Sequence, residues 1–326
     1  MTTRRAILAC LAGVALADAA PQPKKRRSTR NRVAEFDPNA ANSAQWTGGK
    51  GAEPLRAQIL LDRAHFSPGE IDGRQGANFQ RAIRAFQQAR SLPVSGNLDE
   101  ATWAAINADT AAAVVSYRIA GTDVAGPFEK VPSDMMEQAK LKTLGFESAE
   151  EALGEQFHVS PALLKRMNPA VQFTEGTEIL VPNVLTAAAG VADKVVVTKS
   201  GTLTALDAAG AVIAHYPCSS GSEHDPLPIG DWKITGIHRN PAFYYNPQLF
   251  WDADPSHSKA KIAPGPNNPV GVLWIDITKE HYGIHGTPVP ATVGHTQSHG
   301  CIRLTNWDVR ELSTLVSKGL TVSLTE

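Results

Sequence analysis

Cysteine is scarce in this chain, whose 326 residues contain three, at positions 10, 218 and 301. These cysteines form no CxxC pair, and the sequence contains no HExxH run, so it lacks both spacings that are usual for zinc sites. If an N-terminal signal is removed, two cysteines remain, too few for the disulfide framework of a small secreted protein. The scarcity of cysteine therefore favours a reactive thiol over a network of disulfides.

An excess of charge of one sign is also missing. The chain has 31 Lys and Arg against 32 Asp and Glu, a formal net charge of −1. This balance argues against a nucleic-acid-binding protein, which would show a basic face. Hydrophobic residues make up 42% and charged residues 19%, as in globular proteins with sizeable cores, and the length predicts two or three domains.

The N-terminus has the pattern of an export signal. Arg4 and Arg5 precede an apolar stretch at residues 6–17 that is too short to span a bilayer. Small residues at 15–19 offer cleavage sites, so we predict a signal peptide over residues 1–20, cleaved near 17–20, and export to the periplasm or cell wall. Residues 3–8 are similar to a twin-arginine signal. Cys10 follows a lipoprotein-like box, but too few apolar residues separate it from Arg5 for an h-region.

A basic run follows at residues 24–32. Together with the Pro, Ala, Asn and Gly residues after it, this run predicts a disordered, solvated linker over residues 21–50. The alternative is that residues 24–32 contact an anionic membrane or an acidic wall polymer.

Residues 51–112 are predicted to form a small helical domain. Phe79, Ala82, Ile83 and Phe86 recur at the spacing of one helix face. Asp99 is placed to cap a third helix. We therefore expect a three-helix domain here.

Residues 113–185 are predicted to form a second small unit, an α+β module. Ser148 and Glu151 have the spacing of a capping box, and Ser160 is a cap followed by a proline in the first turn. A strand is expected at 177–182. The first half of the unit is unusually long for the order strand, helices, strand.

Residues 190–326 are predicted to be mostly β-structure. Two short apolar runs around Ser200-Gly201 indicate a hairpin. A single helix is expected after Thr305, which serves as its cap, and Lys318-Gly319 is expected to end it. Further strands are expected at residues 211–214, 232–234, 272–275 and 320–322.

The candidate site lies just before that helix, in Ser298-His299-Gly300-Cys301-Ile302-Arg303-Leu304. A Cys thiol has an unperturbed pKa of about 8.5 and needs a base or a positive pocket to form a thiolate at neutral pH. His285, sixteen residues earlier, can take that proton and return it to a leaving amine. Gly300 allows a close approach of the backbone to a developing oxyanion. The cluster therefore predicts a cysteine acyl-transfer site.

Other interpretations of these residues stay open. His299 is a rival base, and His285, His299 and Cys301 are three possible zinc ligands. Arg303 can hold a carboxylate by a bidentate pair. Cys218 is interpreted as a packed residue, since free Cys behaves as a small hydrophobe. The alternative for Cys218 is a disulfide with Cys301 or a redox-sensitive thiol.

The motifs extend over three segments of the chain. Residues 192–326 resemble the L,D-transpeptidase catalytic domain of the YkuD type, and the residues that carry this resemblance are 228–230, 264–271, 282–288, Gly294, 298–304 and 306–307. Residues 53–110 resemble the three-helix peptidoglycan-binding domain family. The matching positions are Gln58, Leu60, Leu61, 68–73, 85–87, Gly96 and 102–103. Residues 116–183 resemble a LysM-like glycan-binding module.

The resemblance implies a multidomain fold, with a mainly-β L,D-transpeptidase catalytic domain preceded by a small three-helix domain and a small α+β module. It implies that Cys301 is the nucleophile and His285 its base, with the Gly286 carbonyl orienting the ring. His299 and Gly300 would form the oxyanion region. Ser298 and Arg303 would contact the substrate.

The implied reaction forms a thioester on a peptidoglycan stem peptide and passes the acyl group to a second amine, which gives a 3-3 crosslink. The acceptor can instead be a lipoprotein lysine, or water, which would make the protein a carboxypeptidase or hydrolase. No cofactor and no metal are expected, and carbapenems should acylate the cysteine. The expected partners are stem peptides and glycan. A non-catalytic wall-binding protein and a zinc-dependent hydrolase are the alternatives from other classes.

Overall fold

The computed structural model describes residues 36–184, 186 and 190–326. The predicted signal peptide, the basic run at 24–32 and Cys10 lie outside these residues. Residues 36–326 form one compact unit. Within them, no helix is both long and apolar enough to cross a membrane.

The end of the predicted linker is folded, which corrects its expected boundary at residue 50. A short 3-10 helix, η1, spans Pro38–Ala41, and Ala41 is fully buried in a cluster with Leu55 and Val114. The Asn42 side chain makes two 2.8 Å hydrogen bonds with the backbone of Val114, one as donor and one as acceptor. Local polarity predicted disorder, but these contacts with distant residues order the segment.

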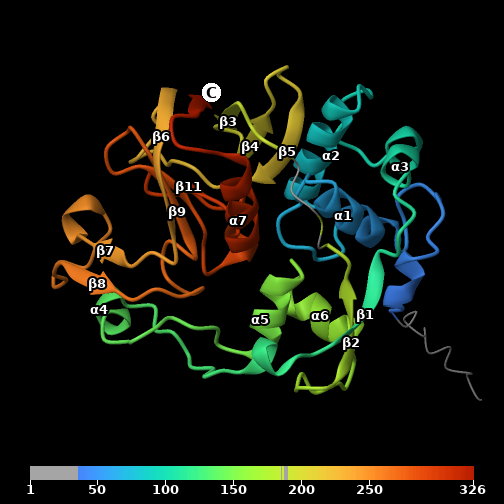
Figure 1. Cartoon of the computed structure of the whole chain (residues 1–326), viewed down its shortest axis with the longest axis horizontal. Helices are drawn as coiled ribbons and strands as arrows, with labels where there is room; N and C mark the ends of the chain where they lie inside the picture. Colours follow the sequence, from blue (N-terminus) through green and yellow to red (C-terminus); the bar gives the residue numbers. More distant parts are fainter. Residues whose placement is uncertain (1–35, 185, 187–189) are drawn as a thin grey trace, which may run out of the picture. The chain divides into compact units, whose positions relative to one another are not determined.

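Three helices form the helical domain, as predicted: α1 (Glu53–Arg63), α2 (Ala77–Ala89) and α3 (Glu100–Ile106) (Figure 1). The predicted stripe of α2 is buried, including Phe79 and Phe86. The Asp99 side chain caps α3 by accepting a hydrogen bond from Thr102 N. Because one face of α2 is apolar, burying it against α1 and α3 builds the core of this domain.

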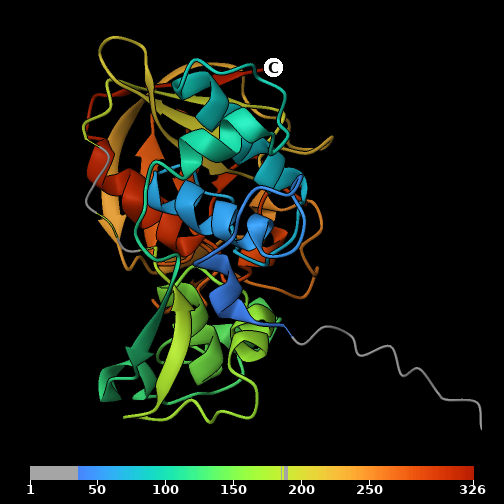
Figure 2. The same cartoon turned by 90° about the vertical axis from the view of Figure 1, so that its right-hand side faces the viewer.

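The middle module consists of two antiparallel strands, β1 (Val114–Arg118) and β2 (Glu178–Pro182), with α5 (Ala149–Gln156) and α6 (Pro161–Met167) packed on them (Figure 2). Ser148 and Ser160 cap the two helices as predicted. The capping box is only half formed, since the Glu151 carboxylate accepts from Glu147 N instead of Ser148 N.

The long connection between β1 and α5 contains the short helices η2 (Gly121–Val124) and α4 (Met135–Gln138). We call residues 126–147 of this connection the arm. The arm accounts for the unusual length of the first half of the module.

The C-terminal domain, residues 192–326, is built on an eight-stranded sheet in the order β11-β10-β9-β6-β12-β3-β4-β5. These strands are β3 (Lys194–Thr198), β4 (Thr202–Leu206), β5 (Val212–Pro217), β6 (Gly230–Arg239), β9 (Leu273–Ile277), β10 (Gly283–His285), β11 (Ile302–Arg303) and β12 (Thr321–Thr325). A separate hairpin pairs β7 (Phe243–Tyr245) with β8 (Ala260–Ile262). Two 3-10 turns, η3 (Pro247–Leu249) and η4 (Pro290–Thr292), lie in loops.

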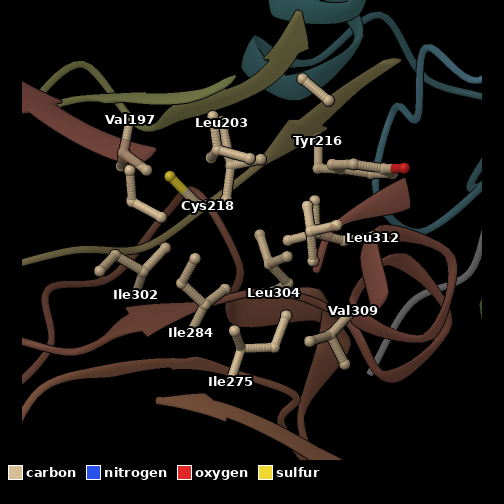
Figure 3. Packing of buried hydrophobic residues seen from close by; sticks show 14 of the residues in the cluster. Val197, Leu203, Tyr216, Cys218, Ile275, Ile284, Ile302, Leu304, Val309 and Leu312 are labelled. Atoms are coloured by element: carbon tan, nitrogen blue, oxygen red, sulfur yellow. The ribbon is translucent and has the colours of Figure 1, made fainter. Parts of the chain in front are cut away.

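The sheet curls until its two ends meet. Just after β5, Ser219 forms an antiparallel bridge with Arg303 of β11, with N–O distances of 3.0 and 2.8 Å. The apolar residues of the curled sheet point inward, and α7 (Asn306–Leu315) covers them with Val309 and Leu312 (Figure 3). Thr305 caps α7 as predicted, but the helix ends at Leu315, before the expected Lys318-Gly319 stop.

The helical domain extends the sheet at its β5 edge. Phe66 forms a parallel bridge with His215. Ser67 N donates to the His215 carbonyl at 2.9 Å, and His215 N donates to the His65 carbonyl at 2.8 Å. These bonds satisfy backbone groups that an edge strand would otherwise expose.

Candidate active site

Two neighbouring strands bring the predicted nucleophile and base together. In the parallel pair of β10 and β11, His285 lies opposite Arg303, and Cys301 is two residues before Arg303. Because side chains alternate along a strand, all three project from the same face of the sheet. Both His285 and Cys301 line one cavity of about 1310 Å³.

The His285 imidazole is buried and held from two directions. Its Nδ1 lies 2.6 Å from the Gly286 carbonyl oxygen, so Nδ1 carries the hydrogen and donates it, leaving the Nε2 lone pair free to accept a proton. The Trp274 ring stacks on the imidazole, with centroids 5.3 Å apart and planes 16° from parallel. Burial lowers the pKa of His285 to about 4, and the Arg303 charge lowers it further, against the effect of the Gly286 carbonyl.

The position of the Gly286 carbonyl depends on Asn306. A Cβ at Gly286 would lie 2.1 Å from Asn306 Oδ1, so only glycine fits there. Asn306 Oδ1 accepts from Val272 N at 3.1 Å, and its Nδ2 donates to Glu155 Oε2 at 2.9 Å. Sequence analysis included Asn306 in the family pattern but gave it no role.

The Cys301 thiol is partly exposed, and its Sγ donates to the His281 carbonyl at 3.6 Å. Burial raises the pKa of the Cys301 thiol to about 11, while a backbone hydrogen bond from Gly283 and the Arg303 charge act in the opposite direction. Thiol and imidazole are therefore both neutral at pH 7. Within the described part of the chain, no hydrogen bond joins Sγ to His285, so the proton must move as the sulfur attacks.

The loop before Cys301 is fixed by Ser298. Its hydroxyl donates to the Cys301 carbonyl at 2.6 Å and accepts from Gly221 N at 2.9 Å. The hydroxyl is thus engaged by backbone, which corrects the prediction that Ser298 contacts substrate and gives it a positioning role. Sequence spacing could not show this, because Gly221 lies far away along the chain.

Gly300 has a conformation that favours glycine. Its φ is +97°, and a Cβ would lie 2.5 Å from the Tyr282 ring. The backbone N–H groups of Gly300 and Cys301 have no hydrogen-bond acceptor among the residues that the structure describes. They are free to bind an oxygen on which negative charge develops.

The His299 imidazole turns toward a surface loop. Its Nε2 lies 2.8 Å from Asp252 Oδ1, and its ring contacts those of Phe250 and Trp251. This arrangement favours His285 over His299 as the base. Among the described residues, no group of three or more His, Cys, Asp or Glu side chains is placed to hold a metal ion.

Arg303 and Cys218 complete the predicted set. The half-buried Arg303 donates from Nη2 to the Gln297 carbonyl and lines the same cavity as Cys301. Cys218 is 1% exposed in the core, as predicted, and burial raises its pKa to about 12. Cys218 and Cys301 are both free, so the alternative of a disulfide between them is wrong.

Several cavity residues had no predicted role. Tyr244, Tyr245 and Tyr282 line the cavity, whereas Trp251 stacks on His224 nearby. Trp274 was expected only as part of a strand. Asp134 of the arm was missed, because nothing in its local sequence relates it to a site more than a hundred residues away.

Comparison with known families agrees with this geometry. Residues 192–324 match the family model of the YkuD L,D-transpeptidase catalytic domain. This part of the chain is an L,D-transpeptidase catalytic domain. Residues 50–106 match the model of a peptidoglycan-binding domain. The predicted fold class is confirmed: a mainly-β L,D-transpeptidase domain follows a small helical domain in a multidomain chain.

Relatives and solved structures carry the same family name. YkuD of Bacillus subtilis (strain 168), named as an L,D-transpeptidase, is 29% identical over 175 residues, which are 53% of this chain and 91% of that protein. YbiS of Escherichia coli (strain K12), similarly named, is 40% identical over 63 residues, or 19% of this chain and 20% of that protein. L,D-transpeptidase 3 from Mycobacterium tuberculosis is 18% identical, covering 48% of this chain and 76% of that chain, with a TM-score of 0.34.

Proposed function

We propose that this L,D-transpeptidase is an exported enzyme that acts on peptidoglycan stem peptides through a thioester on Cys301. One observation carries the proposal: Cys301 shares a cavity with His285, whose Nδ1 is bound to the Gly286 carbonyl and whose Nε2 is free to accept a proton. This is the arrangement that general-base activation of a nucleophile requires.

In the first step the Cys301 sulfur attacks the carbonyl carbon of the diamino acid at its bond to the terminal D-amino acid. The thiol proton passes to His285 Nε2 as the S–C bond forms. The oxygen of the tetrahedral intermediate takes the negative charge, which the free N–H groups of Gly300 and Cys301 stabilise. The C–N bond then breaks, the imidazolium returns the proton to the departing amine, and a thioester remains.

In the second step an amine of another stem attacks the thioester. His285 takes a proton from this amine and returns it to the sulfur as the C–S bond breaks. An amide forms, the thiol is restored, and the product is a 3-3 crosslink. The cavity volume of about 1310 Å³ exceeds the usual range for a single small ligand, which supports room for both donor and acceptor.

The neutral resting pair has a chemical advantage in this mechanism. Burial holds the pKa of Cys301 near 11 and that of His285 near 4. A thiol that is not ionised at rest is less open to oxidation, since the thiolate is the reactive form. Charge separation is then confined to the moment when a carbonyl occupies the site.

The other parts of the chain fit an enzyme that works on an insoluble polymer. The peptidoglycan-binding domain and the LysM-like middle module would raise the effective concentration of the enzyme at the wall. The N-terminal signal would deliver it to the periplasm or cell wall.

Intact-protein mass spectrometry after incubation with a carbapenem tests the proposal. We expect one adduct on the wild type and none on Cys301→Ala, because the β-lactam carbonyl acylates the activated sulfur. Cys218→Ala is the matched control and should still form the adduct. The absence of an adduct on every form would refute the nucleophile assignment.

The acyl acceptor needs a second measurement. Incubation with a stem tetrapeptide, with and without an added amine such as a D-amino acid, separates transfer from hydrolysis. We expect the amine to appear in the product. A product that contains only water-derived carboxylate would favour the carboxypeptidase alternative.

A further inference from the structure

The arm of the middle module crosses to the C-terminal domain beside the active-site cavity. Leu144 N donates to the Pro264 carbonyl at 3.1 Å, and Asn267 N donates to the Leu144 carbonyl at 3.0 Å. The fit is tight, since a Cβ at Gly265 would lie 2.0 Å from the Leu144 oxygen. The backbone of the arm is therefore fixed against the segment that follows β8.

Apolar side chains continue this contact onto the hairpin. Leu144 and Ile262 are fully buried and Tyr245 is 4% exposed, and the three form one cluster. Partly buried side chains from the arm and the hairpin surround it: Val131, Met135, Ala139, Leu141, Phe243, Phe250, Ala260 and Ala263. Burying this surface favours the joined state over a free hairpin, since a two-stranded hairpin alone is marginally stable in water.

A polar chain connects the arm to the same hairpin. Asp134 Oδ2 lies 2.9 Å from His257 Nε2, and His257 Nδ1 lies 3.0 Å from the Tyr245 hydroxyl. The other carboxylate oxygen of Asp134 accepts from Met136 N and Glu137 N and caps α4. One side chain therefore orders the arm and holds the loop between β7 and β8.

The arm also forms part of the cavity wall. Ser133, Asp134 and Met135 line the cavity that contains Cys301 and His285. Figure 1 shows α4 beside β8. Tyr244 and Tyr245 of β7 line the same cavity, so the arm and the hairpin form one continuous wall of mixed origin.

We infer that the arm is a specificity-determining part of the active site: through Asp134 and His257 it holds the β7–β8 wall in the position that grips the stem peptide. The inference rests on the proposed function and names where the substrate is held. A module that served only as a tether would need no side chains in the cavity.

The variant Asp134→Asn tests this inference, because Asn keeps the helix cap while it removes the charge that faces His257. His257→Asn removes the other partner. Glu137→Gln is the matched control, since it breaks the exposed ion pair with Lys140 on the same helix, away from the cavity. Each variant is compared with the full chain for turnover of a stem tetrapeptide, alkylation of Cys301 by iodoacetamide, and amide hydrogen exchange over residues 243–262.

For Asp134→Asn we expect KM to rise about fivefold, the upper range for a single exposed ion pair, with kcat and the alkylation rate unchanged. Hydrogen exchange of the hairpin should accelerate in Asp134→Asn and His257→Asn but not in Glu137→Gln. Unchanged KM and unchanged exchange would overturn the inference. A parallel fall of kcat and alkylation rate would also overturn it, because the whole site would then be disturbed.

The failure of the proposed function gives a different result. If the wild type does not turn over the peptide, the proposed function fails. The exchange experiment still reports whether the arm holds the hairpin.

Discussion

Cys218 and Cys301 lie at the two ends of the curled sheet, one just after β5 and the other just before β11, where the bridge between Ser219 and Arg303 joins them. Burial raises the pKa of both thiols, to about 12 for Cys218 and to about 11 for Cys301. The ionisation of the free thiol therefore does not distinguish an inert cysteine from a nucleophile in this protein.

Their neighbours differ. Cys218 lies in the core with Val197, Leu203 and Ile302 (Figure 3), whereas Cys301 lines an open cavity with His285. The comparison indicates that reactivity here comes from a positioned base and from access for the carbonyl. A low intrinsic thiol pKa is not required.

Removing the base should have the largest effect on this comparison. We expect His285→Ala to slow acylation of Cys301 by a carbapenem about 10²- to 10⁴-fold, the usual contribution of general-base catalysis. The rate of adduct formation, followed by mass spectrometry, measures this. His299→Ala should cost less, and a larger loss in that variant would make His299 the base.

The pH dependence of alkylation gives a smaller but sharper test. With the pKa of Cys301 near 11, the thiolate fraction at pH 7 is small and grows about tenfold per pH unit. The rate of reaction with iodoacetamide should therefore rise from pH 7 to pH 10 without levelling off. A plateau near pH 7 would mean that the thiol is ionised at rest, and the neutral pair would be wrong.

Substitution of the inert cysteine should change stability and leave the chemistry intact. Cys218→Ser buries a hydroxyl in an apolar core, which costs about 1–3 kcal/mol of unfolding free energy. Cys218→Val keeps the site apolar and should cost less than about 1.5 kcal/mol. Urea unfolding measures both, and the carbapenem adduct should persist. Loss of the adduct in the folded Val variant would contradict the assignment of Cys218 as structural.

The sequence predicted what is local. Cys301, His285 and Gly286 fall within a short run around β10 and β11, and the pairing of those strands brings them to one face. The caps at Ser148, Ser160 and Thr305 were also readable, because a capping side chain bonds to residues two or three positions away.

Long-range contacts were not readable in the same way. The arm has no regular apolar period, so its cluster with Tyr245 and Ile262 left no pattern in its own sequence. Asn306 bonds to Glu155, 151 residues away, and Ser298 bonds to Gly221, 77 residues away. Such roles depend on which segments the fold brings together.

The bonds that Ser67 makes to His215 also decide where this protein can be divided. A chain cut at residue 190 would keep all eight strands of the sheet but leave β5 with bare N–H and C=O groups, which invite pairing between copies. Such a fragment should aggregate, although it would contain every residue of the reaction. The border between two families in the sequence is thus no border for an expression fragment.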